Sequence, residues 1–344
     1  SAGGIVVFFE RRVRKEGERP MTKAIQVSET GGPEVLVFTD VEVSKPGPGE
    51  ALVRHTSIGL NFIDVYFRTG TYPAPHLPFI PGMEGAGEVL ELGEGVSHLS
   101  VGDRVAYAGP MGSYSEERTI DAGVLVKIPE GVSDDQAASM MLQGMTARYL
   151  LRETFRVGPE HTILFHAAAG GVGLIAGQWA KHLGATVIGT AGSAEKIELA
   201  KQNGYDHVIN YRDEDFVERV NEITDGKKCD VVYDSVGKDT FPGSLDCLKM
   251  RGMWASFGQS SGSLPEVNLG ILSQKGSLFA TRPTLFNYIP TRDLLEETAN
   301  DLFNVVSSGA VKLHLNQTYD LADAAQAHRD LEGRKTIGST VLKP

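Results

Sequence analysis

The sequence predicts an α/β protein with two domains, one rich in β-strands and one built on a doubly wound parallel sheet. Its 344 residues exceed one ordinary domain, since a domain takes roughly 150 residues. From residue 21 to about 130, short β-like runs are broken by turn residues. From residue 162 onward, apolar strand-like runs alternate with helical patterns. That alternation is typical of a parallel sheet covered by helices.

Residues 1–20 differ from the rest of the chain, because a charged run comes after the short apolar patch 5–9. A secretory signal places its charge before the apolar run, and a transit peptide avoids acidic residues such as Glu16 and Glu18. We therefore interpret residues 1–20 as an extension ahead of the natural start at Met21, without a part in the chemistry.

The stretch from 21 to about 130 favours an irregular, barrel-like β domain, because its strand candidates are short and separated by Pro- and Gly-rich turns. These candidates lie at 35–38, 51–55 and 88–92. A helix is then expected to begin after Ser133, since Gln136 three residues later completes a capping box.

The second half consists of repeated strand and helix units. The strand candidates are 162–166, 186–189, 208–210, 230–234 and 252–257. After about residue 285 the alternation stops, and helices at 291–308 and 321–332 precede a last strand at 339–342. The alternation predicts a doubly wound sheet over the middle of the chain.

Charge and cysteine usage exclude several classes of function. The chain has 44 acidic residues against 33 Lys and Arg, a formal net charge of −11, which disfavours nucleic acid and anionic membranes as partners. No long stretch is free of charged or strongly polar residues, so no membrane span is expected. Cys229 and Cys247 belong to no close Cys/His cluster, which indicates a reducing cytosol rather than a disulfide scaffold.

A glycine-rich segment follows the first strand of the α/β half and opens a helix. Gly170 and Gly173 fit the pattern G-x-G-x-x-G, with Ala168 in place of the first glycine. Bare backbone at these positions lets main-chain N–H groups approach a pyrophosphate. A glycine-rich structural turn is the alternative, but the order strand, loop and helix favours a dinucleotide-binding loop.

The second strand of this half lacks the acid that grips the ribose 2′-hydroxyl of NAD. It ends at 188–193 without Asp or Glu, and Lys196 follows within one helical turn. A nearby ammonium fits the 2′-phosphate of NADPH, although Lys196 alone also fits an ordinary solvated lysine.

Four separated motifs, at 61–73, 165–173, 232–237 and 267–270, resemble the quinone oxidoreductases of the zeta-crystallin group within the medium-chain dehydrogenase/reductase superfamily. The resemblance runs from about Met21 to the C-terminus. It implies a GroES-like catalytic domain formed by 21–145 and 286–344, and a Rossmann NADPH-binding domain at 146–285. It also implies a homodimer, and an apolar edge strand near 277–280 is where two copies are expected to pair.

The same resemblance implies which residues bind the cofactor. On the nicotinamide side they are Asn61, Phe62, Asp64, Tyr66, Tyr149, Phe257, Gly258, Phe279 and Thr281. At the pyrophosphate they are Gly171 and Val172, and at the adenosine phosphate Gly192, Ser193, Lys196, Tyr211 and Arg334. Taken alone, each of these residues is more often an aromatic residue of the core, a glycine in a turn or a basic residue on the surface. Their order and spacing together favour a cofactor-binding site.

No metal site is expected. Zinc alcohol dehydrogenases of the same superfamily have a cysteine where Asn61 stands and a histidine where Met83 stands. Neither an amide nor a thioether is a good zinc ligand. Two cysteines in all are also too few for a four-cysteine structural zinc lobe.

These features predict a cytoplasmic, NADPH-dependent quinone reductase that works without a metal, by transfer of a hydride or of single electrons. Hydride addition to a quinone or conjugated enone gives a delocalised anion, whereas alcohol chemistry needs a Lewis acid. Tyr66 is the first choice for a hydrogen bond to the developing phenolate or enolate, and Asn61 and Arg282 are weaker candidates. The aromatic residues expected to line the acceptor cleft are Phe62, Tyr66, Tyr72 and Phe279.

Two alternatives stay open. The chain fits an NADPH-dependent enone or alkenal reductase on the same scaffold, and sequence does not separate this from a quinone reductase. It also fits an NADPH-binding structural protein of the crystallin kind, or an RNA-associated one. The net charge of −11 and the lack of a basic-aromatic strip argue against RNA.

Overall fold

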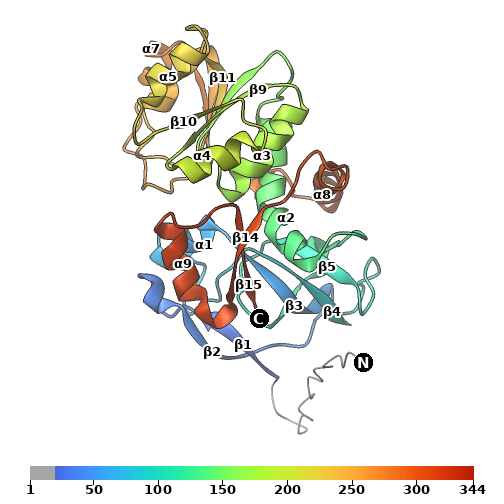
Figure 1. Ribbon diagram of the computed structural model, residues 1–344. Helices are drawn as coiled ribbons and strands as arrows, with labels where there is room; N and C mark the ends of the chain where they lie inside the picture. Colours follow the sequence, from blue (N-terminus) through green and yellow to red (C-terminus); the bar gives the residue numbers. More distant parts are fainter. Residues whose placement is uncertain (1–19) are drawn as a thin grey trace, which may run out of the picture.

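The computed structural model describes residues 20–344, so the predicted extension lies outside the described residues except for its last position. Two lobes face each other across the helix α2 (Asp134–Tyr149) (Figure 1). The middle of the chain, green to orange, forms the upper lobe, and the blue and red segments share the lower one. Within residues 20–344, no helix is both long enough and apolar enough to span a membrane.

The upper lobe contains a six-stranded parallel sheet in the order β10-β9-β8-β11-β12-β13. Its strands are β8 (Thr162–Phe165), β9 (Thr186–Ala191), β10 (His207–Asn210), β11 (Cys229–Asp234), β12 (Leu248–Ser256) and β13 (Phe279–Thr281). The order reverses between β8 and β11, and ligands of such sheets bind outside the carboxyl ends of the strands at that point. The prediction of a doubly wound sheet is confirmed.

Two helices of this lobe have side-chain caps on the main-chain N–H groups of their first turn, whereas a third has none. The helices of the lobe are α3 (Gly171–His182), α4 (Ala194–Lys201), α5 (Phe216–Ile223), α6 (Gly243–Asp246) and α7 (Gly270–Gln274). Ser193 caps α4 by accepting a hydrogen bond from the main chain of Lys196 (3.3 Å). Asp215 caps α5 in the same manner. No side chain caps α3, which begins after Gly170, so its first N–H groups are free to bind an anion.

The lower lobe contains a seven-stranded sheet in which β14-β15-β3-β4-β5-β7 are neighbours and β6 pairs with β3. Its strands are β3 (Glu50–Leu60), β4 (Glu84–Leu92), β5 (Arg104–Ala108), β6 (Glu117–Asp121), β7 (Val126–Lys127), β14 (Leu315–Asp320) and β15 (Ser339–Lys343). A separate pair joins β1 (Met21–Gln26) to β2 (Val37–Glu42). Because β15 lies between β14 and β3, segments from both halves of the described chain complete one sheet.

The remaining helices connect the lobes or cover the lower sheet. They are α1 (Phe62–Thr69), α8 (Arg292–Ser307) and α9 (Ala324–Glu332), with short 3-10 turns at Pro33–Val35, Ala122–Val124, Leu285–Asn287 and Leu321–Asp323 and a π-helical turn at Leu150–Thr154. The predicted capping box of α2 is confirmed, with Ser133 and Gln136 exchanging bonds of 3.0 and 3.1 Å. Because α2 runs through the expected domain boundary at residue 145, that boundary stays a prediction.

Some predicted elements differ from the structure. The strand expected at 35–38 is a 3-10 turn followed by β2, because Pro33 starts a turn there. Helix α1 and strand β14 were missed in the sequence pattern. Helix α1 is short and its inner face is partly polar, with Asp64 and Arg68 buried. With only eight residues, the helix is shorter than the window over which a helical period can be recognised.

Asp234, the last residue of β11, holds the loop after this strand. Its buried carboxylate accepts hydrogen bonds from the main-chain N–H of Gly237 (3.1 Å) and from the hydroxyl groups of Thr240 and Ser244 (both 2.8 Å). Burial tends to raise the pKa of Asp234, but the nearby His166 and these hydrogen bonds lower it below its ordinary value. The carboxylate therefore fixes this loop as an anion.

We predict that Asp234→Ala lowers the free energy of unfolding by about 3–5 kcal/mol, because several buried donors lose their acceptor at once. Urea denaturation followed by tryptophan fluorescence measures this, since Trp179 and Trp254 both lie in the upper lobe. Asp239→Ala, in the same loop but exposed, is the control, with an expected loss below about 1 kcal/mol. Equal losses in the two variants would contradict the role of Asp234.

Candidate active site

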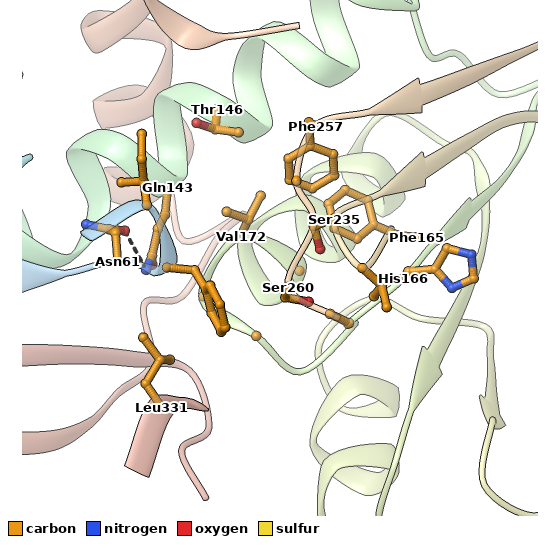
Figure 2. A pocket seen from close by; sticks show the side chains of 18 of the residues that line it. Asn61, Gln143, Thr146, Phe165, His166, Val172, Ser235, Phe257, Ser260 and Leu331 are labelled. Carbon is orange, nitrogen blue, oxygen red and sulfur yellow. Dashed lines mark hydrogen bonds between the residues drawn. The ribbon is translucent and has the colours of Figure 1, made fainter. Parts of the chain in front are cut away.

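A cleft of about 800 Å³ lies between the lobes, over the carboxyl ends of β8, β9 and β11. Asn61 and Gln143 come from the lower lobe and α2, respectively (Figure 2). Phe165 ends β8 of the upper lobe, and His166 and Phe257 come directly after β8 and β12. The position agrees with the switch point of the sheet, so the cleft is the candidate active site.

The loop after β8 presents bare main chain to the cleft. A Cβ atom on Gly173 would lie 2.2 Å from the carbonyl oxygen of Ala167, so a side chain has no room there. Ala167 itself has a positive φ of 55°. Gly170 and Gly171 lead into the uncapped first turn of α3. This arrangement of glycines and free N–H groups fits the pyrophosphate of a dinucleotide.

Cationic side chains gather beyond the ends of β9 and β10. The Nζ atom of Lys196 donates to the main-chain oxygen of Arg334 (3.0 Å), and the guanidinium of Arg334 donates to the hydroxyl of Tyr211 (2.9 Å). Burial and the neighbouring Arg334 lower the pKa of Lys196, against the opposing effect of Tyr211. Arg334 also lies 3.7 Å from the carboxylate of the exposed Asp239. Such a cluster fits an anion, such as the 2′-phosphate of NADPH.

Aromatic side chains form the wall near α1. The ring of Tyr66 lies 5.5 Å from that of Phe62 and 4.9 Å from that of Tyr72. The main-chain N–H of Gln259 donates to the Tyr66 hydroxyl (2.9 Å). Burial raises the pKa of Tyr66 to about 12, so the phenol keeps its proton at neutral pH. Because its oxygen already accepts a bond, the Tyr66 hydroxyl is free to donate into the cleft.

Arg282 lies beside this aromatic wall. Its guanidinium donates to the main-chain oxygen of Pro283 (3.1 Å) and to the hydroxyl of Tyr72. Within residues 20–344 no ion pair is found for Arg282. Its remaining N–H groups can therefore stabilise negative charge on an acceptor.

Behind the cleft, Asn61 belongs to a buried polar network. Its amide nitrogen donates to Glu84 (2.7 Å), and its amide oxygen accepts from Gln143 (3.2 Å; dashed in Figure 2). The main chain of Leu142 donates to the other oxygen of Glu84 (2.9 Å), and Ser339 donates to Gln143 (2.6 Å). Burial raises the pKa of Glu84 to about 8, although the bonds from Asn61 and Leu142 lower it. The network orients the Asn61 amide.

Most of the predicted site residues lie along this one cleft. Those that line it are Asn61, Phe62, Tyr66, Tyr149, Gly170, Gly171, Val172, Gly173, Gly192, Lys196, Tyr211, Phe257, Gly258, Arg282 and Arg334. The roles assigned to each of them in cofactor binding and catalysis stay predictions.

Four predicted residues do not line the cleft: Asp64, Ser193, Phe279 and Thr281. The carboxylate of Asp64 is buried below Asn61, where it caps α1. Ser193 caps α4. Phe279 is 59% exposed at the start of β13, whereas the cleft lies at the carboxyl ends of the strands. The structure therefore differs from the expectation that Phe279 belongs to the aromatic wall.

Several lining residues were missed from the sequence: Gln143, Thr146, His166, Ser235 and Ser260. His166 is the informative case, since it comes directly after β8 and bonds to Thr190 and Ser244, both at 2.9 Å. Burial lowers the pKa of His166, and its ring connects the residue after β8 to Thr190 in β9 and to Ser244 in α6. Its place in the glycine-rich motif was the available signal.

The expected absence of a metal site stays a prediction. Over the described part of the chain, no three His, Cys, Asp or Glu side chains are grouped so as to hold a metal ion. Asn61 and Glu84 bond to each other, and Met83 is buried.

The chain resembles known proteins over nearly its whole length. It matches the family models of the zinc-binding dehydrogenase at residues 171–291 and of the alcohol dehydrogenase GroES-like domain at 47–130. A quinone oxidoreductase of Pseudomonas aeruginosa is 54% identical over 94% of this chain and 100% of that protein. A 2-haloacrylate reductase of a Burkholderia species is 46% identical over 94% of this chain and 99% of that protein.

Among solved structures, that of Escherichia coli quinone oxidoreductase complexed with NADPH has a TM-score of 0.92 at 51% identity. The match covers 94% of this chain and 100% of that one. Together with the two family models, this confirms the predicted combination of a GroES-like domain with a Rossmann domain.

We predict that wild type loses stability relative to Glu84→Gln as the pH rises from about 4.5 to about 8. The ordinary pKa is 4.5 and the folded value is about 8, so the folded chain holds this proton more tightly than the unfolded chain. The stabilisation is complete below pH 4.5 and is lost as the pH rises through 8. The largest slope is about 1.4 kcal/mol per pH unit.

Urea denaturation of both proteins at pH 5, 6, 7 and 8 measures the difference. Glu88→Gln, on the exposed face of the same strand, is the matched control and should track wild type at every pH. A difference between wild type and Glu84→Gln that does not change with pH would show that Glu84 is ionised throughout.

Proposed function

The chain belongs to the quinone oxidoreductases of the medium-chain dehydrogenase/reductase superfamily, and on that premise we propose that it reduces quinones with NADPH. One observation carries the proposal. A single cleft joins an uncapped helix N-terminus, a cluster of cations and an aromatic wall. These three parts suit the pyrophosphate, the 2′-phosphate and a flat acceptor in that order.

The residues that would hold the cofactor fit NADPH. The first turn of α3 receives the pyrophosphate, and Lys196, Tyr211 and Arg334 receive the 2′-phosphate. When bound, NADPH supplies a hydride to the acceptor. The cleft walls hold the acceptor against the nicotinamide and keep water out.

Side chains near α1 stabilise the charge that forms on the acceptor. A quinone that gains a hydride becomes a hydroquinone anion, and one proton from the surrounding water completes the hydroquinone. The Tyr66 hydroxyl donates to the developing phenolate, and it stays protonated because burial raises its pKa to about 12. Asn61 and Arg282 offer further N–H groups, and the amide of Asn61 is oriented by Glu84.

The second candidate function is the reduction of conjugated enones or acrylates. The relative named 2-haloacrylate reductase favours it, and the same donors would stabilise an enolate. We set aside a structural or RNA-associated role, because the close relatives are named as oxidoreductases. A cytoplasmic location also remains our proposal, supported by the free thiols of Cys229 and Cys247.

We further propose a homodimer in which β13 pairs with its copy. This strand is an edge of the six-stranded sheet. Apolar side chains lie exposed near it, with Phe279 at 59%, Met250 at 80% and Leu269 at 76%. An exposed apolar edge strand is suited to pairing between chains.

Lys196→Ala should raise the dissociation constant for NADPH about tenfold or more and leave that for NADH nearly unchanged. A charge-assisted contact contributes about 1.5–3 kcal/mol, and only NADPH has the 2′-phosphate. Fluorescence titration of both cofactors measures this. Lys201→Ala, at the far end of the same helix and exposed, is the control. Equal weakening of NADPH and NADH would refute the assignment.

The enzyme should reduce simple ortho- and para-quinones with NADPH and oxidise primary alcohols negligibly. The aromatic wall offers shape but few hydrogen bonds, so several quinones should be accepted. Tyr66→Phe should lower kcat/KM only about three- to tenfold, since one hydrogen bond contributes about 1 kcal/mol. NADPH oxidation across quinones, enones and aldehydes, with and without a chelator, measures these rates.

Three outcomes of that screen would count against the proposal. Enones that turn over far faster than every quinone would establish the enone reductase. NADPH binding without reduction of any acceptor would favour a non-enzymatic role. Loss of activity with a chelator, restored by zinc, would contradict metal-free chemistry.

Light scattering at micromolar concentration should give about twice the chain mass of 37.0 kDa. Phe279→Lys on the edge strand should shift the protein toward monomer, because a charge there opposes pairing. A monomer mass for the wild type would contradict the dimer.

A further inference from the structure

Residues 333–338, the strap between α9 and β15, connect the lower lobe to the phosphate pocket. At one end of the strap, the N–H of Gly338 donates to the main-chain oxygen of Ala169 in the phosphate loop (3.1 Å). Near the other end, two pocket residues bond to Arg334. Lys196 donates to the main-chain oxygen of Arg334, and the Arg334 guanidinium donates to the hydroxyl of Tyr211. Arg334 has a positive φ of 58°, a conformation that persists only where the surroundings hold it.

The residue that precedes the strap is fastened to a buried arginine. Both carboxylate oxygens of Glu332 accept from the guanidinium of Arg68, at 2.8 and 2.9 Å. Arg68 is 1% exposed, and it also donates to Gly31 (3.1 Å) and His328 (2.9 Å). Because these hydrogen bonds fix the orientation of the Arg68 guanidinium, the Glu332 carboxylate can form its two bonds in one position only.

Glu332 lines the cleft two residues before Arg334. A free carboxylate there would repel the phosphate that Arg334 is placed to bind. The bidentate bond draws the carboxylate onto Arg68 and balances its charge. Arg68 therefore fixes the position of Glu332 at the start of the strap and also balances the negative charge of its carboxylate.

We infer that the Arg68–Glu332 ion pair is a positioning element that places Arg334 for the 2′-phosphate and thereby sets the preference for NADPH over NADH. The inference rests on the proposed use of NADPH. Neither Arg68 nor Glu332 touches the phosphate, since each acts through the strap.

A chain of hydrogen bonds also connects the Arg68–Glu332 ion pair to Asn61 on the acceptor side of the cleft. Arg68 donates to Nδ1 of His328, so Nε2 carries the proton and donates to the Tyr114 hydroxyl (2.9 Å). Tyr114 donates to Asp64 (2.8 Å), which accepts from the main chain of Asn61 (3.0 Å). The strap and the N-terminus of α1 are thus fastened to one buried cluster.

The test compares binding of 2′,5′-ADP, NADPH and NADH to the full-length chain by calorimetry. Glu332→Ala should raise the dissociation constant for 2′,5′-ADP about three- to tenfold and raise the ratio of the NADPH constant to the NADH constant by a similar factor. Glu332→Gln keeps one acceptor for Arg68 and should give an intermediate value. If Glu332→Ala does not fold, as judged by thermal melting, Glu332→Gln carries the test.

A double-mutant cycle with Arg334→Ala tells whether Glu332 acts by placing Arg334 or by its own negative charge. If Glu332 acts through Arg334, the double variant should bind 2′,5′-ADP no more weakly than Arg334→Ala alone. Asp301→Asn is the matched control, because it also removes a carboxylate from a buried arginine, Arg148 (3.0 Å). That variant should leave all three constants unchanged.

The outcomes that overturn the inference are distinct from those that overturn the proposed function. Unchanged binding of 2′,5′-ADP by Glu332→Ala, or effects that multiply fully with Arg334→Ala, would overturn the inference alone. Tighter binding by Glu332→Ala would show that Glu332 acts only as a repelling charge, and would also overturn it. A wild type that does not bind 2′,5′-ADP would overturn the use of NADPH and the inference together.

Discussion

The hydrogen bonding of one buried carboxyl group, that of Glu84, governs how the acceptor side of the cleft is built. A buried carboxyl group is costly unless each of its oxygens finds a donor. The donors come from two places, Asn61 after β3 and the main chain of Leu142 in α2. Gln143 extends the network to Ser339 in β15. The relative positions of β3, β4, α2 and β15 are therefore set by polar contacts as well as by apolar packing.

The phosphate side of the cleft depends on a different constraint, the geometry of the parallel sheet. All strands of the upper lobe end at one edge, so the loops after β8, β9 and β11 meet there. The anion of Asp234 holds the loop after β11, and His166, directly after β8, bonds to Thr190 in β9 and to Ser244 in α6. Main-chain N–H groups of α3 are left without a side-chain cap. The result is a hydrogen-bonded, electropositive floor for a dinucleotide.

Local charge in the cleft opposes the charge of the whole chain. The formal net charge is −11, and a dianionic phosphate is repelled by that field at long range. Salt screens such repulsion beyond about 10 Å, whereas Lys196 and Arg334 act at contact distance. The ion pair of Arg68 with Glu332 keeps the cleft carboxylate beside that strap balanced. Selection of an anionic cofactor is thus a property of the pocket and not of overall composition.

Local patterns in the sequence determined the doubly wound sheet, the capping box at Ser133 and the glycine-rich loop at Gly170 and Gly173. Each depends on residues close together in the chain, where propensity and hydrogen bonding act directly. Which side chains reach the cleft was decided by tertiary structure. Lys196 meets Arg334 across 138 positions, Gln143 enters from inside a helix, and Phe279 turns outward at a strand start. Such placements depend on packing between distant segments, because burial is decided by the partners that surround a residue and not by its neighbours in sequence.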